Sequence, residues 1–269
     1  GKPTDDDYRA ARDSYLLWLK DEIENRKKTA IHSGQYINIR LTESFHLTRP
    51  WTYQAYDPDE KPKQFDSIEA AFESFGQRLL LLGKPGSGKT TTLLHMAGVL
   101  SGVARLSYSA PLPVMLSLAR WPSSSERQGK LLRLPSPSKN EWTFADWLAD
   151  SVAGLPGAGV SQAVASSWME RGQVALLLDG LDEVHEKRLP DLMAGLNSYL
   201  EAHPRLAVMA CSRLAEYTAI ARDRAGQLRL NGAVTLQPLT QGQVASYLTA
   251  AQAVGLRDSL ANNIELDDL

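Results

Sequence analysis

The stretch "LLLLGKPGSGKTTT", from Leu79 to Thr92, constrains this chain more than any other part of its sequence. Four consecutive leucines have the length of a buried strand, and the threonines at the other end suit the first turn of a helix. The glycine-rich backbone between them can turn successive N–H groups inward, and a helix N-terminus adds partial positive charge. A strand, a tight turn and a helix in this order therefore predict a phosphate-binding site.

The same stretch fits the pattern G-x-x-x-x-G-K-[ST] at every required position. A chance match somewhere in a chain of this length has odds of roughly 1%. The residues predicted to bind nucleotide phosphates are Gly83, Lys84, Pro85, Gly86, Ser87, Gly88, Lys89, Thr90 and Thr91. We expect the Lys89 ammonium to bridge the β- and γ-phosphates, the Thr90 hydroxyl to ligate Mg²⁺, and Thr91 to contact the α-phosphate.

A second motif, "VALLLDGLDEV", is a continuous apolar run that ends in acidic residues. Asp179 falls at the end of the expected strand, where a carboxylate holds Mg²⁺ through water; an acid that only caps the strand is the alternative. In many ATP-driven motors a glutamate follows directly and polarises the attacking water, but Gly180 occupies that position here. Water activation is therefore predicted to lie with Asp182 or Glu183.

A third motif, "RLAVMACSR", is an expected strand that ends in Ser212 and Arg213. A guanidinium at that position is predicted to contact the γ-phosphate through forked hydrogen bonds, and a surface salt bridge is the alternative. Cys211 lies inside the apolar run, so we interpret it as a buried strand residue and not as a nucleophile. As the single cysteine of the chain it excludes an internal disulfide and indicates a reduced, cytoplasmic environment.

Apolar strand-like runs alternate with amphipathic helical segments along the chain. The expected strands lie at about 79–82, 114–118, 174–179, 205–213 and 233–239, and several of them are uniformly apolar. Uniformly apolar strands indicate a parallel sheet that is covered on both faces. The predicted fold is therefore an α/β three-layer sandwich with a five-stranded, mainly parallel sheet, preceded by a helix over 8–28.

The chain divides into three expected parts. Residues 1–65 form a helical and strand extension, with a short strand in "GQYINIRLTES"; residues 66–240 form the nucleotide-binding core; and residues 241–269 begin a truncated helical domain. The Ser- and Pro-rich, basic stretch from Trp121 to Asn140 is interpreted as a surface insertion, with a partner or nucleic-acid contact as the alternative. From its two ends, we expect the chain to be the middle of a longer protein.

Charge and hydropathy exclude several classes of partner. Lys and Arg number 29 against 31 Asp and Glu, so no overall field attracts the protein to nucleic acid. No apolar run approaches the ~20 residues that a membrane helix needs. The first residues are acidic and polar where a secretory signal is basic and then apolar. We therefore expect a cytoplasmic protein without a membrane partner, and any nucleic-acid contact would have to be a local patch.

Five segments together resemble a known family. In this order and spacing, "RLLLLGKPGSGKTTTLLHMA", "LPVMLSLARW", "VALLLDGLDEV", "VMACSRLAEY" and "LQPLTQGQVASYL" are similar to the NACHT family of signalling ATPases, a branch of the STAND group of P-loop NTPases. The distinguishing feature is the small residue after the metal-binding aspartate, followed by an Asp-Glu pair. The resemblance covers roughly Arg78 to Leu248. It implies phosphate binding by 83–91, magnesium binding by Thr90 and Asp179, water activation by Asp182 or Glu183, and γ-phosphate sensing by Arg213.

The resemblance also implies a mode of action. In such a switch, ADP holds the full-length protein closed and monomeric, and ATP exchange permits self-association that brings flanking effector and sensor domains together. Slow hydrolysis resets it, and bacterial members act in defence against phage. Family members draw the adenine-binding wall from the segment before the P-loop, which here implies Ile37, Ile39 and Arg40; a plain sheet edge is the alternative. One departure is that this chain ends before the helical and winged-helix domains that close the family's site.

Three other interpretations stay open at this stage. A P-loop kinase or transferase requires an acceptor pocket and an arginine-rich lid, and the stretch from Trp121 to Asn140 lacks a compact lid pattern. A DNA-associated ATPase would be stimulated by DNA and show a steep salt dependence of binding. GTP in place of ATP is a variant of the switch, although the sequence lacks the N-K-x-D motif that reads guanine in common GTPases.

Overall fold

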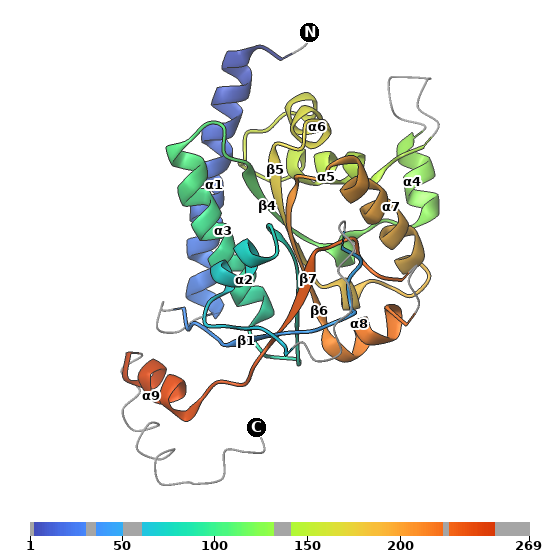
Figure 1. The fold of residues 1–269 in the computed structure, drawn as a ribbon. Coiled ribbons are helices and arrows are strands. Elements are labelled where there is room, and N and C mark those ends of the chain that lie inside the picture. Colours follow the sequence, from blue (N-terminus) through green and yellow to red (C-terminus); the bar gives the residue numbers. More distant parts are fainter. Residues whose placement is uncertain (1–2, 31–35, 51–60, 132–140, 223–225, 251–269) are drawn as a thin grey trace.

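The structure, a computed structural model, describes residues 3–30, 36–50, 61–131, 141–222 and 226–250. Within these ranges the chain has an α/β fold with one sheet of seven strands, in the order β2-β1-β7-β3-β6-β5-β4, which contains both parallel and antiparallel pairs. Helices lie on both faces of the sheet (Figure 1). The strands are β1 Leu41–Glu43, β2 Gln64–Phe65, β3 Arg78–Gly83, β4 Leu112–Ser117, β5 Val174–Asp179, β6 Ala207–Arg213 and β7 Gly232–Leu236.

The five strands expected from the sequence lie next to one another in this sheet. Neighbouring pairs from β7 through β3, β6 and β5 to β4 are all parallel. Almost every residue of β3, β5 and β6 is buried, as expected for strands that are covered on both faces.

The expected number of strands is wrong, because the sheet has seven strands and not five. The two additional strands, β1 and β2, extend the sheet beyond β7 in antiparallel register, with Leu41 opposite both Leu236 and Phe65. They are three and two residues long, too short for a periodic pattern to mark them in the sequence. In the segment "GQYINIRLTES" the strand begins only at Leu41. Residues 36–40, which the sequence predicts to belong to it, have no regular structure.

Helices cover both faces of the sheet. In Figure 1, α1, α2 and α3 lie on one face, and α5 and α7 on the other. The helices are α1 Asp5–Ala30, α2 Ile68–Ser74, α3 Lys89–Leu106, α4 Ser124–Leu131, α5 Phe144–Ala153, α6 Gln162–Glu170, α7 Leu189–Ala202, α8 Leu214–Ile220 and α9 Gln241–Ala250, with 3₁₀ turns η1 Leu118–Arg120 and η2 Leu181–Glu183. No helix in the described ranges combines the length and the apolar character needed to cross a membrane.

The expected N-terminal helix is confirmed as α1, which packs beside α3. Its apolar positions at helical spacing, Tyr15, Leu19 and Ile23, are buried at 1%, 3% and 5% exposure. The Tyr15 hydroxyl donates a 2.9 Å hydrogen bond to the carbonyl of Pro113, the second residue of β4. The extension is therefore part of the same packed core as the sheet.

The basic stretch after Trp121 is described only up to residue 131, where it forms α4. Arg127 lies 2.6 Å from the Asp191 carboxylate, and Lys130 lies 2.6 Å from that of Asp150. Two of its basic side chains are thus paired within the protein. The rest of the expected insertion, at 132–140, and the part of the expected helical domain beyond 250 lie outside the described residues.

A buried cation holds the first residue of β3. Arg78 is 2% exposed, and its guanidinium donates to the carbonyls of Leu200, His203, Pro204 and Arg229 at 2.9–3.4 Å. Leu200 and His203 lie at the C-terminus of α7, where the helix dipole favours a positive charge. Burial lowers the pKa of Arg78 to about 10, so the side chain stays charged at neutral pH. This cation connects β3 to α7 and to the segment before β7.

Replacing Arg78 with Met should lower the free energy of unfolding by about 3 kcal/mol or more, because several partly buried carbonyls lose a charged donor together. Arg105→Met is the matched control: among the described residues the exposed Arg105 donates only to the Leu16 carbonyl, so its loss should cost about 1 kcal/mol or less. Urea unfolding followed by circular dichroism measures both. Equal losses in the two variants would contradict this account of Arg78.

Candidate functional site

The sequence motifs meet at one edge of the sheet, where the parallel strands end. In the register between β3 and β6, Gly83 lies directly opposite Arg213. Strand β5 is the next neighbour of β6 and ends at Asp179. In open α/β sheets ligands bind outside the carboxyl ends of the strands. The phosphate loop, the aspartate and the arginine thus come from three adjacent strands of this edge.

The loop between β3 and α3 runs from Gly83 to Gly88. Gly86 and Gly88 have φ values of +74° and +91°, in the left-handed region that glycine adopts without strain. Gly88 is the N-cap of α3, and no side chain in the described structure caps that helix. The N–H groups of the first turn of an 18-residue helix are therefore left available for an anion.

The loop also contains a cation and a buried hydroxyl group. The Lys89 ammonium donates to the carbonyls of Gly83 and Lys84 at 3.1 and 2.9 Å, so it lies against the loop backbone. The Ser87 hydroxyl is buried and has no hydrogen-bond partner among the described residues. An unpaired buried hydroxyl carries a free-energy penalty, and a phosphate oxygen is a suitable acceptor for it. The residues present therefore fit a bound phosphate chain.

A hydroxyl and a carboxylate meet beside this loop. The Thr90 hydroxyl donates a 2.8 Å hydrogen bond to the Asp179 carboxylate. The pKa of Asp179 is raised by burial, lowered in part by the Thr90 hydrogen bond and the Lys89 charge, and raised again by Asp182. Oxygen atoms of these two kinds are the ligands that Mg²⁺ prefers, and a cation would relieve the cost of the half-buried charge. Within the described ranges, no group of three or more His, Cys, Asp or Glu side chains forms a metal cage.

The turn after β5 explains why glycine follows the aspartate. Gly180 has φ +74°, and a Cβ atom at this position would lie 2.8 Å from the carboxylate of Glu183. A side chain at position 180 would therefore be strained and would displace Glu183. The sequence shows that an acid is missing at position 180 and that an Asp-Glu pair follows, whereas the structure shows that the small residue makes room for the Glu183 side chain.

Asp182 and Arg213 form an ion pair. The Asp182 carboxylate accepts the backbone N–H of Arg213 at 2.9 Å and lies 3.1 Å from its Nε atom. The Asp182 side chain is 6% exposed, whereas that of Arg213 is 44% exposed and also lies 3.5 Å from Glu216. The salt bridge that the sequence left as an alternative for Arg213 is thus present, and one of its partners is buried at the candidate site.

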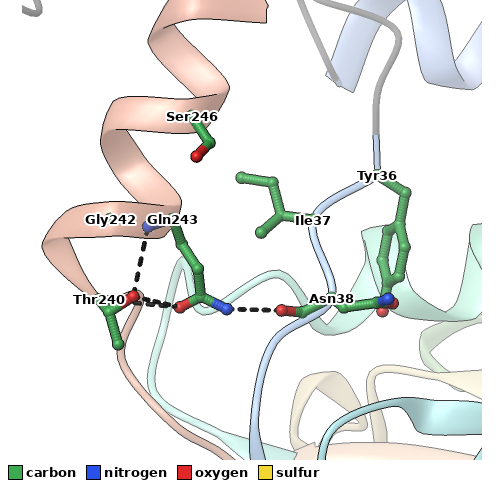
Figure 2. Close-up of a pocket in the computed structure, with 7 residues that line it drawn as sticks. All are labelled: Tyr36, Ile37, Asn38, Thr240, Gly242, Gln243 and Ser246. Atoms are coloured by element: carbon green, nitrogen blue, oxygen red, sulfur yellow. Dashed lines mark hydrogen bonds between the residues drawn. The ribbon is translucent and has the colours of Figure 1, made fainter.

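A cavity of about 570 Å³ lies between the segment before the core and the start of α9 (Figure 2). Its lining residues are Tyr36, Ile37, Asn38, Thr240, Gly242, Gln243 and Ser246. The Gln243 side chain donates to the Asn38 carbonyl at 2.6 Å and accepts from the backbone N–H of Thr240 at 2.8 Å. The first turn of α9 is thereby joined to residues 36–38.

The predicted base-contact residues lie at different places along one segment. Ile37 lines the cavity, as Figure 2 shows. Ile39 is buried, and a Cβ atom added to Gly88 would lie 3.3 Å from its Cδ1 atom, so it packs against the phosphate loop. The Arg40 side chain is exposed, and its carbonyl accepts from Gln237 at 2.9 Å. This segment therefore connects the phosphate loop to the cavity.

Sequence reasoning missed most of the cavity wall. Tyr36 stacks on His95 of α3 with ring centroids 3.8 Å apart, and its hydroxyl lies 3.5 Å from Thr92. A local signal existed for one other part: Thr240 followed by Gln243 is the spacing of a capping box, and both reciprocal hydrogen bonds are present. No local sequence pattern predicts that this capping box contacts residues 36–38, because those residues lie about 200 positions earlier in the chain.

Comparisons with known proteins leave the family open. No model of a known protein family matches this chain, and no curated protein matches it either. The resemblance to the NACHT family therefore stays a prediction from the motifs.

Replacing Asp179 with Asn should stabilise the protein in the absence of nucleotide by about 0.5–1 kcal/mol, because it removes a half-buried charge near Asp182. The amide oxygen can still accept the Thr90 hydrogen bond. Chemical unfolding in EDTA measures this gain, and magnesium-dependent nucleotide binding should be lost in the same variant. A stability loss, or nucleotide binding that responds to EDTA as in the wild type, would contradict these roles of Asp179.

Proposed function

We propose that this chain is the nucleotide-binding module of a molecular switch. It binds ATP or ADP with Mg²⁺, hydrolyses ATP slowly, and controls the self-association of a larger signalling protein. The observation that carries this proposal is the arrangement of Lys89, Thr90 and Asp179 around the N-terminus of α3, which no side chain caps in the described structure, at the carboxyl ends of the strands. The parallel order of the five core strands supports a P-loop NTPase sandwich for residues 66–240.

Each residue of the loop has a distinct task in this proposal. The backbone N–H groups of 83–91, except at Pro85, surround the phosphates, and the Lys89 ammonium leaves the loop carbonyls for the β- and γ-phosphates. Thr90 and Asp179 hold Mg²⁺, which when bound neutralises phosphate charge. Arg213 contacts the γ-phosphate from the neighbouring strand β6 and thereby distinguishes ATP from ADP.

The cavity beside α9 is the proposed site for the base. The amide side chain of Asn38 can form hydrogen bonds with a purine edge, and Ile37 supplies an apolar surface. We propose adenine and not guanine, because the sequence lacks the N-K-x-D motif. Since one wall of the cavity belongs to α9, a bound base contacts the start of the proposed helical domain at 241–269. Contact of this kind supports a switch, in which the bound nucleotide changes the position of the helical domain relative to the core.

The wider setting rests on the family resemblance alone. It supports self-association in the ATP state, flanking effector and sensor domains outside this chain, a cytoplasmic location and a part in defence against phage. Neither DNA nor a transferase acceptor enters this proposal.

Lys89→Ala should weaken ATP and ADP binding by about 10- to 100-fold, because it removes a charge-assisted hydrogen-bond donor to the phosphates. Lys84→Ala is the matched control, since its exposed side chain belongs to the same loop while only its backbone takes part in the site. Isothermal titration with each nucleotide in magnesium measures both variants. Binding by Lys89→Ala within about twofold of the wild type would remove the basis of the site.

ATP turnover by this module should be slow, at or below about 0.1 s⁻¹, a hundredfold under the typical enzyme rate. Gly180 replaces the adjacent acid of motor enzymes, and the exposed Glu183 and Arg213 side chains leave the site open to water. Phosphate release under saturating ATP measures the rate, with Lys89→Ala as the control for contaminating activity. A rate of several turnovers per second would indicate an engine and not a switch.

A further inference from the structure

Two adjacent acids of η2 have different surroundings. Asp182 is nearly buried, at 6% side-chain exposure, whereas Glu183 is exposed. The sequence treats them as interchangeable candidates for water activation. Their contacts separate them.

Both oxygens of the Asp182 carboxylate are engaged by Arg213. One accepts the backbone N–H of Arg213 at 2.9 Å, and the other lies 3.1 Å from Nε. A general base needs a lone pair that faces the reacting water, and these contacts occupy the carboxylate with a neighbouring residue.

The Asp182 contact does not involve the terminal nitrogens of the Arg213 guanidinium. Asp182 contacts Nε, while forked recognition of an anion uses the terminal nitrogens of a guanidinium. One of these terminal nitrogens, Nη1, lies 3.5 Å from Glu216, in a partly exposed pair that is weak and easily exchanged. Asp182 thus fixes the Arg213 side chain at its inner end, directly beside Gly83 in the β3–β6 register.

The Glu183 carboxylate is placed differently. It folds over the backbone of Gly180, the residue that follows Asp179, and it is open to solvent. No hydrogen bond or ion pair ties its carboxylate to another described residue. It therefore lies near the proposed phosphate and metal site with unengaged oxygens.

We propose that Asp182 is a positioning residue that orients Arg213 toward the γ-phosphate. We propose that Glu183 is the general base, whose carboxylate accepts a proton from the water that attacks the γ-phosphate as ADP leaves. This inference rests on the proposed function, and it assigns separate tasks to the Asp-Glu pair. Asp182 affects the ratio of ATP to ADP affinity, and Glu183 affects the rate of ATP hydrolysis.

The test measures two quantities in four proteins: the ratio of ATP to ADP affinity, and the single-turnover rate of hydrolysis at saturating ATP. Asp182→Asn keeps the shape of the side chain and removes its charge, and Glu183→Gln makes the same change one residue later. Arg213→Ala and the Asp182→Asn/Arg213→Ala double variant complete the set. Affinities for ADP within about twofold of the wild type show that each variant is folded.

Asp182→Asn should lower the ATP-to-ADP affinity ratio about five- to tenfold, as should Arg213→Ala, and the double variant should lose no more than Arg213→Ala alone. Glu183→Gln should leave the ratio within about twofold of the wild type and slow hydrolysis at least about tenfold. A purely structural role of Asp182 would lower both affinities equally. If Asp182→Asn fails to fold, Arg213→Lys, which keeps the charge without an Nε contact, should lower the ratio in the same way.

Additive losses in the double variant, or an unchanged ratio in Asp182→Asn, would overturn the positioning role. So would a Glu183→Gln variant that hydrolyses ATP at the wild-type rate, since the water would then be activated elsewhere. A wild-type protein that binds neither nucleotide would overturn the proposed function and this inference with it. Normal wild-type binding separates the two failures.

Discussion

The parallel register of β3, β6 and β5 is the constraint on which the candidate site depends. Gly83 begins the phosphate loop at the end of β3, Arg213 lies opposite it at the end of β6, and Asp179 ends the next strand. A shift of one residue between two parallel strands would turn every buried side chain to the other face. The apolar cores of these strands therefore hold the register, and the register places three polar groups from distant parts of the chain at one edge.

Lys89, Asp179 and Asp182 each have a partner within the protein at this edge. Lys89 contacts the loop carbonyls, Asp179 accepts from Thr90, and Asp182 holds Arg213. Each contact compensates part of the cost of a charge near the protein interior. Phosphate and magnesium would supply the opposite charges that Lys89 and Asp179 lack. The Asp182 contact, which the proposed ligand does not replace, keeps Arg213 in position and is a form of preorganisation.

The cavity connects this edge to the end of the described chain. Ile39 packs against Gly88 of the phosphate loop, and two residues earlier Ile37 lines the cavity. On the other side of the cavity, Gln243 of α9 binds the Asn38 carbonyl. A ligand that spans the loop and the cavity would therefore contact both the core and α9, and the differential contacts of two nucleotides could bias the position of that helix.

Local patterns along the chain were sufficient to predict the α/β class, the five core strands, the helix over 8–28 and the position of the glycine-rich loop between β3 and α3. These depend on unbroken apolar runs, helical periodicity and glycines at set spacing. The folded chain was needed to show that β1 and β2 join the sheet, that Tyr36, Asn38 and Gln243 meet across a cavity, and that Asp182 is paired with Arg213 while Glu183 is exposed. Such features come from strand order and from contacts between residues up to 205 positions apart, which no local pattern encodes.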